Sequence, residues 1–397
     1  MNVEARINSS LDVRGQFPAI VKWHYLDSAA TAQKPQAVID AINAAYARDY
    51  ATVHRGIYQR SSDMTAAYEA ARAAAAGLIG GAAQELVFTR GATEAINLVA
   101  RVLPRGGRDR VLLSALEHHS NIVPWQLAGY EIDVCPLTED GRIDLDAAEG
   151  MVSERHRVVA FAHVSNALGS ILDAQRAAEI AHGAGALLLL DGCQAVPRIP
   201  VDVAAIGCDF YAFSAHKLYG PTGIGCLWGR SELLEAMPPW HGGGAMIENV
   251  TFERTTYAPP PQRFEAGTPH IVGAIGLHAA VEWVENLSLG AIHAHESALA
   301  GECRAALAAI PGVTLYGPED SVGIVSFNVA GVHAHDVATI LDDAGVAVRA
   351  GHHCAQPLME LLGIDATARA SFAAHSDSSD IEALVGGLHQ VKRIFEA

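Results

Sequence analysis

The sequence predicts an α/β fold in which helices cover both faces of a mostly parallel sheet. Short apolar runs alternate with alanine-rich stretches of helical length, and neither an internal repeat nor a low-complexity tract is present. The chain has 397 residues, half of them apolar and 18% charged, which is enough for a large core and two domains.

The predicted elements follow from these runs in chain order. Strands are expected at residues 85–89, 110–114, 158–163, 186–191, 209–213 and 223–228. Helices are expected at residues 64–79, 93–103, 174–182 and 274–285. Sheets of this class bind ligands at the carboxyl ends of their strands, so the residues that follow the strands are the candidates for a site.

Two segments rich in proline and glycine, 238–244 and 259–261, interrupt this pattern and are interpreted as long functional loops. From about Ile271 the chain resumes as a helix followed by an α+β region. We therefore predict an N-terminal segment (residues 1–24), a large ligand-binding domain (25–270) and a smaller α+β domain (271–397).

Charge and composition exclude several classes of function. A net charge of -17 makes the chain a poor ligand for nucleic acid and for anionic membranes. The first twenty residues lack the apolar run of a secretory signal, and the apolar stretch 184–190 is too short to span a bilayer, so a cytoplasmic protein is expected. The six cysteines form no CxxC pair, which predicts neither a disulfide framework nor a metal site.

The sequence Ser214-Ala215-His216-Lys217 directly follows a predicted strand. A lysine at the end of a buried strand can form a Schiff base with an aldehyde, and burial beside cations favours its nucleophilic neutral form. Taken alone, a lysine in this position is more often a surface residue at a strand-to-turn junction.

Asp191-Gly192-Cys193-Gln194 closes another predicted strand. An ionised aspartate there could keep a pyridine nitrogen protonated, and Gln194 could donate to a phenolic oxygen of the same ring. The alternative is an aspartate that caps a helix.

Two further turns carry candidate ligand contacts. The turn from Arg90 to Glu94 opens a helix with glycine and presents free N–H groups to a phosphate, although many α/β proteins have such turns. The turn Glu117-His118-His119-Ser120-Asn121 offers a histidine ring that could stack on a planar cofactor. A structural histidine pair is the alternative, and no carboxylate or cysteine lies at a persuasive spacing for a metal.

A second centre is Arg349-Ala350-Gly351-His352-His353-Cys354. Histidines and arginine around the cysteine predict a cationic setting that favours the thiolate. Arg349 and Arg369 could pair with a substrate carboxylate through two parallel hydrogen bonds. The alternative for Cys354, and our interpretation of the other five cysteines, is a small buried apolar residue.

Together these motifs resemble the class V aminotransferase-like enzymes that use pyridoxal phosphate (PLP). More narrowly, they resemble group II cysteine desulfurases of the SufS/CsdA type. The ordered markers are VHRGI (53–57), EHHSNIVPW (117–125), HVSN (163–166), FSAHKLYGPTG (213–223), RFEAGTP (263–269) and RAGHHC (349–354). The resemblance extends from Tyr25 to Ser371 and implies fold type I, with a seven-stranded sheet in the large domain.

The resemblance implies a role for each candidate residue. Lys217 would carry PLP, with His118 stacked on the ring, Asp191 at its nitrogen and Gln194 at its phenolic oxygen. The phosphate would be held by Ala92, Thr93, Ser214 and His216, and by Thr268 of a neighbouring subunit in a homodimer. The substrate would be bound by Ala29, Ala30, Asn166 and Arg369, with Arg349 near the nucleophile.

Cys354 would take the sulfur of L-cysteine as a persulfide, which leaves L-alanine. The short spacing from Arg349 to Cys354 matches group II, whose loop cannot travel far, so a SufE-like or SufU-like acceptor protein would come to the site. The persulfide would serve iron–sulfur cluster or other thio-cofactor assembly.

The sequence departs from its relatives at Cys193, where alanine is common, and in its short segments before Tyr25 and at 126–134. Three alternatives remain open: a selenocysteine lyase, another class V reaction, and an inactive scaffold that only binds an assembly partner. The motif ending in Cys354 argues against another class V reaction, and the intact set of Lys217, Asp191 and His118 argues against the scaffold.

Overall fold

A computed structural model describes residues 11–395, so the first ten residues of the predicted N-terminal segment lie outside it. The large sheet has seven strands in the order β2-β8-β7-β6-β5-β3-β4. Their bounds are β2 Leu86–Thr89, β3 Arg110–Ser114, β4 Glu131–Cys135, β5 His156–Ala162, β6 Leu187–Asp191, β7 Phe210–Ser214 and β8 Gly225–Gly229. Only β8 runs against its neighbours, which confirms the predicted mostly parallel sheet.

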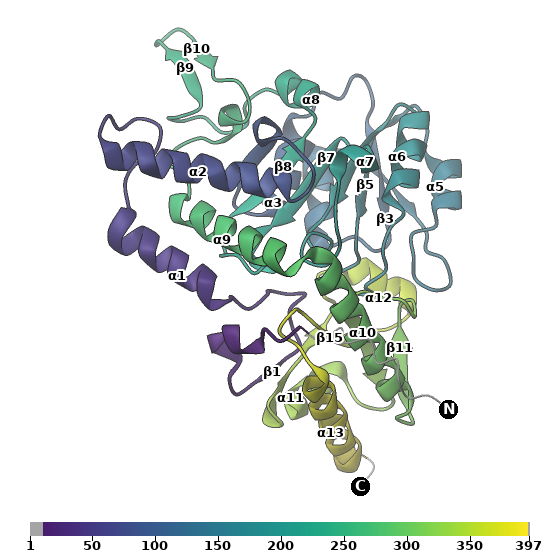
Figure 1. Ribbon diagram of the computed structural model, residues 1–397. Coiled ribbons are helices and arrows are strands. Elements are labelled where there is room, and N and C mark those ends of the chain that lie inside the picture. The colour runs from purple at the N-terminus through teal and green to yellow at the C-terminus, as the bar shows by residue number, and fades with distance from the viewer. Residues whose placement is uncertain (1–10, 396–397) are drawn as a thin grey trace.

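Alternate residues of the strands face two separate apolar layers, because successive side chains of a strand point to opposite faces. In β3, Leu112 packs into one layer while Val111 and Leu113 pack into the other. Helices cover both faces, as Figure 1 shows. They are α2 Gln59–Gly77, α6 Ala174–Gly183 and α9 Ile271–Leu287 with the first layer, and α3 Ala92–Val102 and α4 Val123–Ala128 with the second.

A second, antiparallel sheet lies below the first in Figure 1, in the order β11-β12-β15-β14. Its strands are β11 Val313–Tyr316, β12 Ile324–Val329, β14 Arg349–Gly351 and β15 Thr367–Ser371. The helices of this part are α10 Leu289–Ala308, α11 Ala334–Asp343, α12 Gln356–Leu362 and α13 Ser378–Phe395. The short strand β1 (His24–Tyr25) pairs with β13 (Val346–Ala347), so the residues around Tyr25 lie against this smaller part.

The predicted strands and helices agree with the structure to within a few residues, but several other elements were not predicted, among them one strand of the large sheet, a hairpin and four short helices. The edge strand β4 carries Glu131 and Asp133 between its apolar residues and is half exposed, so its sequence lacks a buried run. A hairpin of β9 (Ile247–Val250) and β10 (Thr255–Tyr257) lies between the two predicted loops. The remaining helices are α1 Gln36–Ala44, α5 Leu145–Met151, α7 Val203–Ile206 and α8 Ser231–Ala236. Within residues 11–395, no helix has the length and apolar character that a membrane crossing requires.

Candidate active site

A cavity of about 240 Å³ opens where the carboxyl ends of β3, β5, β6 and β7 meet β14 and β15. Its lining includes every predicted site residue except Thr268: Ala29, Ala30, Ala92, Thr93, His118, Asn166, Asp191, Gln194, Ser214, His216, Lys217, Arg349, Cys354 and Arg369. Residues far apart in the sequence meet here because parallel strands end at one edge of their sheet. The prediction did not assign a role to Ser120, Ala162 or Val164, which also line the cavity.

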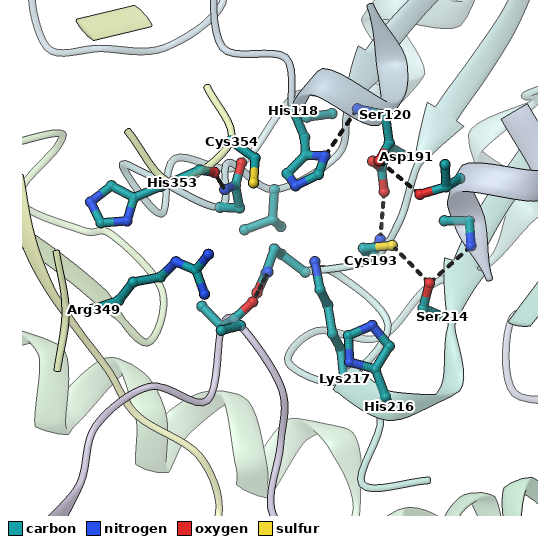
Figure 2. A pocket seen from close by; sticks show the side chains of 18 of the residues that line it. His118, Ser120, Asp191, Cys193, Ser214, His216, Lys217, Arg349, His353 and Cys354 are labelled. Carbon is teal, nitrogen blue, oxygen red and sulfur yellow. Dashed lines mark hydrogen bonds between the residues drawn. The ribbon is translucent and has the colours of Figure 1, made fainter. Parts of the chain in front are cut away.

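Lys217 ends the single helical turn that follows β7, and Figure 2 shows its amine pointing into the cavity. Among the described residues, no hydrogen bond or ion pair holds this amine. It is therefore available to a ligand carbonyl.

Asp191 is the last residue of β6 and is buried, with one carboxylate oxygen accepting a hydrogen bond from the backbone N–H of Cys193 at 2.9 Å. No cationic side chain forms an ion pair with it within residues 11–395. Burial of a carboxylate without a cationic partner costs free energy, so the site is suited to a ligand that places a positively charged atom beside Asp191.

His118 lines the cavity directly after the end of β3 (Figure 2). Burial, together with the nearby Lys217, lowers the pKa of His118 to about 4, so its ring is neutral near pH 7. Its Nδ1 accepts a hydrogen bond from Ser120 N at 3.1 Å, which places the proton on Nε2. A neutral ring of this kind can stack on a flat ligand.

Glu117, the residue before His118, is fully buried and fastens this turn to the sheet. One carboxylate oxygen accepts hydrogen bonds from Ser114 Oγ (2.5 Å) and Ala162 N (3.0 Å), and the other accepts from Asn121 Nδ2 (2.6 Å). Burial raises the pKa of Glu117 to about 7, although these hydrogen bonds oppose the rise. The three bonds hold His118 in place, a contribution that the sequence analysis did not assign.

The N-terminus of α3 forms a second end of the cavity. Ala92 N donates to Ser214 Oγ at 2.9 Å, and the hydroxyls of Thr93 and Ser120 are 2.8 Å apart. The first N–H groups of a helix and clustered hydroxyls suit a phosphate. His216 lies beside them, and burial lowers its pKa to about 4.

These features fit PLP. Asp191 would face the ring nitrogen, Lys217 the aldehyde, His118 the ring face, and the α3 N-terminus with Ser214 the phosphate. The uncompensated carboxylate of Asp191 carries this assignment, because a protonated pyridine nitrogen would supply the missing cation.

Arg369 of β15 marks the substrate end of the cavity. Its Nη1 donates to Asn166 O at 2.7 Å and its Nη2 to Asp27 Oδ1 at 3.1 Å, while its buried Nε has no partner among the described residues. Burial lowers the pKa of Arg369 to about 10, which leaves it charged. Together with Arg349, which Figure 2 shows reaching the same space, it could bind a carboxylate.

Cys354 lies in the turn between β14 and α12 and lines the same cavity as His118 (Figure 2). It is the only cysteine that is not fully buried among the described residues. The turn is held from two sides, by His119 N donating to Cys354 O and by Asn166 Nδ2 donating to His353 O, both at 2.7 Å. Both His353 (φ 53°) and Cys354 (φ 57°) adopt left-handed backbone conformations, which are unusual for residues other than glycine.

The prediction that His353 contributes positive charge beside Cys354 is wrong. This ring is buried against Thr367, with Nε2 and Oγ1 at 2.8 Å, and burial with Arg369 and Arg349 lowers its pKa to about 2. A neutral His353 adds no positive charge near the thiol, so the predicted cationic setting would depend on Lys217, Arg349 and Arg369, which line the same cavity.

Thr268 lies outside this cavity and lines a separate pocket of about 350 Å³ with Tyr68, Arg90, Trp240 and His270. Its predicted contact with the phosphate of a neighbouring subunit involves a second chain and stays a prediction.

The fold and this cavity define a class of enzyme. The sequence model of the family Aminotransferase class-V matches residues 24–384, and the chain belongs to that family. A "NIFS-LIKE PROTEIN" of known structure has the same fold at 20% identity (TM-score 0.81), covering 93% of this chain and 99% of its own. Within the class, the chain belongs to the cysteine desulfurases.

This narrower assignment rests on closer relatives. The cysteine desulfurase of Dickeya dadantii is 49% identical over 397 residues, covering 96% of each chain. The crystal structure of the cysteine desulfurase CsdA from Escherichia coli has a TM-score of 0.91 at 42% identity, covering 96% of this chain and 98% of its own. The structure of the cysteine desulfurase from Thermococcus onnurineus NA1 has a TM-score of 0.92 at 38% identity, covering 96% of this chain and 97% of its own. The predicted family, fold, enzyme class and PLP cofactor are thereby confirmed.

Proposed function

We propose that this protein transfers the sulfur of L-cysteine to Cys354 and releases L-alanine. One observation carries the proposal: the amine of Lys217, the thiol of Cys354 and the guanidinium of Arg369 open onto one cavity. In the overall reaction, L-cysteine and the Cys354 thiol are converted to L-alanine and a Cys354 persulfide, and no external oxidant is needed.

In this proposal Arg369 and Asn166 hold the substrate carboxylate, since the free Nε of Arg369 can donate to it. PLP, when bound to Lys217, supplies an electron sink for negative charge at the substrate Cα. Once the substrate amine has replaced Lys217 at the cofactor, the freed Lys217 amine would remove the Cα proton, while Asp191 would keep the ring nitrogen protonated.

The neutral ring of His118, with its proton on Nε2, packs over the site and excludes water from it. The Cys354 thiolate attacks the substrate sulfur, so an S–S bond forms as the C–S bond breaks. The electron pair of the broken bond stays on the carbon side, which is protonated to give alanine.

The persulfide is proposed to pass to a SufE-like or SufU-like acceptor that comes to the cavity. The two hydrogen bonds that hold the Cys354 turn support this, because a fixed turn cannot carry sulfur far from the site. An acceptor must therefore bring its own thiol to Cys354.

A homodimer is proposed as the working unit. Ile57, close before α2, and Phe252, at the tip of the β9–β10 hairpin, are fully exposed apolar side chains. Large apolar side chains that are exposed together can form an interaction surface. A second copy of the chain would cover them and bring its Thr268 to the partner.

The test is alanine and sulfide release from L-cysteine with a reductant, for the wild type and Cys354→Ala. Equal amounts of both products are expected from the wild type. Cys354→Ala should bind PLP yet release at least a hundredfold less, because it lacks the acceptor thiol. Cys303→Ala, which removes a buried thiol of α10 far from the cavity, is the matched control and should stay active.

Full activity of Cys354→Ala on L-cysteine would contradict the proposal. If that variant instead kept activity on selenocysteine alone, the result would favour a selenocysteine lyase.

A further inference from the structure

The amide of Gln194 has a fixed orientation in the cavity wall. Its Oε1 accepts from Arg198 Nη1 at 2.8 Å, and its Nε2 donates to Ala29 O at 2.7 Å. A guanidinium can only donate, so the atom of Gln194 that faces Arg198 must be the oxygen. The second N–H of Nε2 therefore remains for the cavity, which Gln194 lines.

Arg198 is itself held by a buried partner from another part of the fold. Its Nε lies 3.1 Å from Glu296 Oε2, and both side chains are almost fully buried. The two atoms form a close ion pair rather than an aligned hydrogen bond. Burial raises the pKa of Glu296 to about 7, and Arg198 opposes that rise.

Two neighbours complete this arrangement. Tyr219, which follows Lys217 by two residues, donates its hydroxyl to Glu296 Oε1 at 3.5 Å. Gly323, next to β12, leaves room for the pair, because a Cβ there would lie 2.5 Å from Glu296 Oε2 and 3.0 Å from Arg198 Nε. The pair therefore joins α10 to the turn of Lys217 and to Gln194.

We propose that Arg198, held by Glu296, is a positioning residue that keeps an N–H of Gln194 aimed at the phenolic oxygen of the PLP ring. This inference rests on the proposed function, since it needs PLP bound to Lys217. Without Arg198, the amide of Gln194 can rotate and present its oxygen to the ring oxygen instead.

The experiment is a pH titration of the visible absorbance of the PLP-loaded protein, combined with thermal melting of each variant. Loss of a donor to the ring oxygen makes the bound chromophore more basic. Arg198→Met should therefore raise the titration midpoint by about one pH unit, the effect of one lost hydrogen bond to a charged group. Arg198→Lys, which can still only donate, should recover much of the wild-type midpoint.

Two further variants separate positioning from stability. Arg198→Met with Glu296→Leu removes both charges, so it avoids an unpaired buried carboxylate and should show the same shift even if Arg198→Met alone does not fold. Arg304→Met removes an arginine of α10 that bonds Tyr316 O and Gly317 O away from the cavity, and should leave the midpoint unchanged.

An unchanged midpoint in folded, PLP-loaded Arg198 variants would overturn the positioning role while leaving the proposed function intact. If borohydride reduction of the wild type with PLP leaves no label on Lys217, the proposed function fails and the inference fails with it.

Discussion

The two arginines of the cavity differ in what holds them. The guanidinium of Arg369 is fixed by Asn166 and Asp27, whereas the guanidinium of Arg349 has no hydrogen-bond partner among the described residues. A fixed guanidinium is already oriented for a carboxylate, so little ordering is left to occur when substrate binds.

Arg369→Lys should therefore weaken substrate binding more than chemistry. Lysine keeps the charge but loses the planar fork, and a charge-assisted hydrogen bond contributes about 1.5–3 kcal/mol. We expect the KM for L-cysteine to rise roughly tenfold to a hundredfold, with a smaller change in kcat. Steady-state alanine production measures both constants, and an unchanged KM would remove Arg369 from the substrate site.

Glu117 should make stability depend on pH. Its pKa rises from 4.5 in the unfolded chain to about 7 in the folded protein, so the folded form keeps a proton that the unfolded form releases. The contribution of Glu117 is therefore fully present below pH 4.5 and is lost as pH rises toward 7.

Melting temperatures of the wild type and Glu117→Gln between pH 4.5 and 8 test this. The wild type should lose stability relative to the variant as pH rises to about 7, and the difference should then level off. Parallel curves across this range would show that Glu117 does not titrate there.

The sequence identified residues that perform chemistry better than residues that hold them. Lys217 and Asp191 were recognisable because each follows an apolar strand. Arg198 was not, since its partner Glu296 is distant in sequence and a long-range contact leaves no local pattern. The charge of His353 was misjudged because burial is not visible from its neighbours in the chain.

Among the secondary-structure elements, burial decided what could be predicted. The central strands β5, β6 and β7 are covered on both faces and consist largely of apolar residues. The edge strand β4 and the β9–β10 hairpin are largely exposed, so their sequences resemble those of loops.

Helix α2 is tied to β2 and to the segment before Thr268 by one buried ion pair. Arg72 of α2 donates to both carboxylate oxygens of Glu265, at 2.5 and 2.9 Å, and Glu265 also accepts from Phe88 N of β2 at 2.7 Å. Removing one partner of such a pair leaves an uncompensated buried charge.

Arg72→Met should lower the free energy of unfolding by about 3–5 kcal/mol, as measured by urea denaturation. Arg72→Met with Glu265→Gln should be less destabilised, because no buried charge is then left unpaired; Glu69, which also pairs with Arg72, is partly exposed to water. A double variant no more stable than the single one would show that the pair is not the source of the effect.

At the scale of the whole molecule, the exposed apolar side chains and the separate position of Thr268 support assembly. Light scattering should give a mass of twice 41.8 kDa for the wild type. Ile57→Glu with Phe252→Glu should shift the protein toward monomer, because a charge is costly in a buried interface. A wild-type mass of 41.8 kDa would exclude the dimer.

Substitutions of Gly323 should be poorly tolerated, although this residue does not line the cavity. Its φ of 60° disfavours side chains, and the space that a methyl group would need is filled by Glu296 and Arg198. A saturation scan scored by growth should find this position depleted of substitutions although it does not line the cavity. In related enzymes, Gly323, Glu296 and Arg198 would then be expected either to be retained together or to be replaced together.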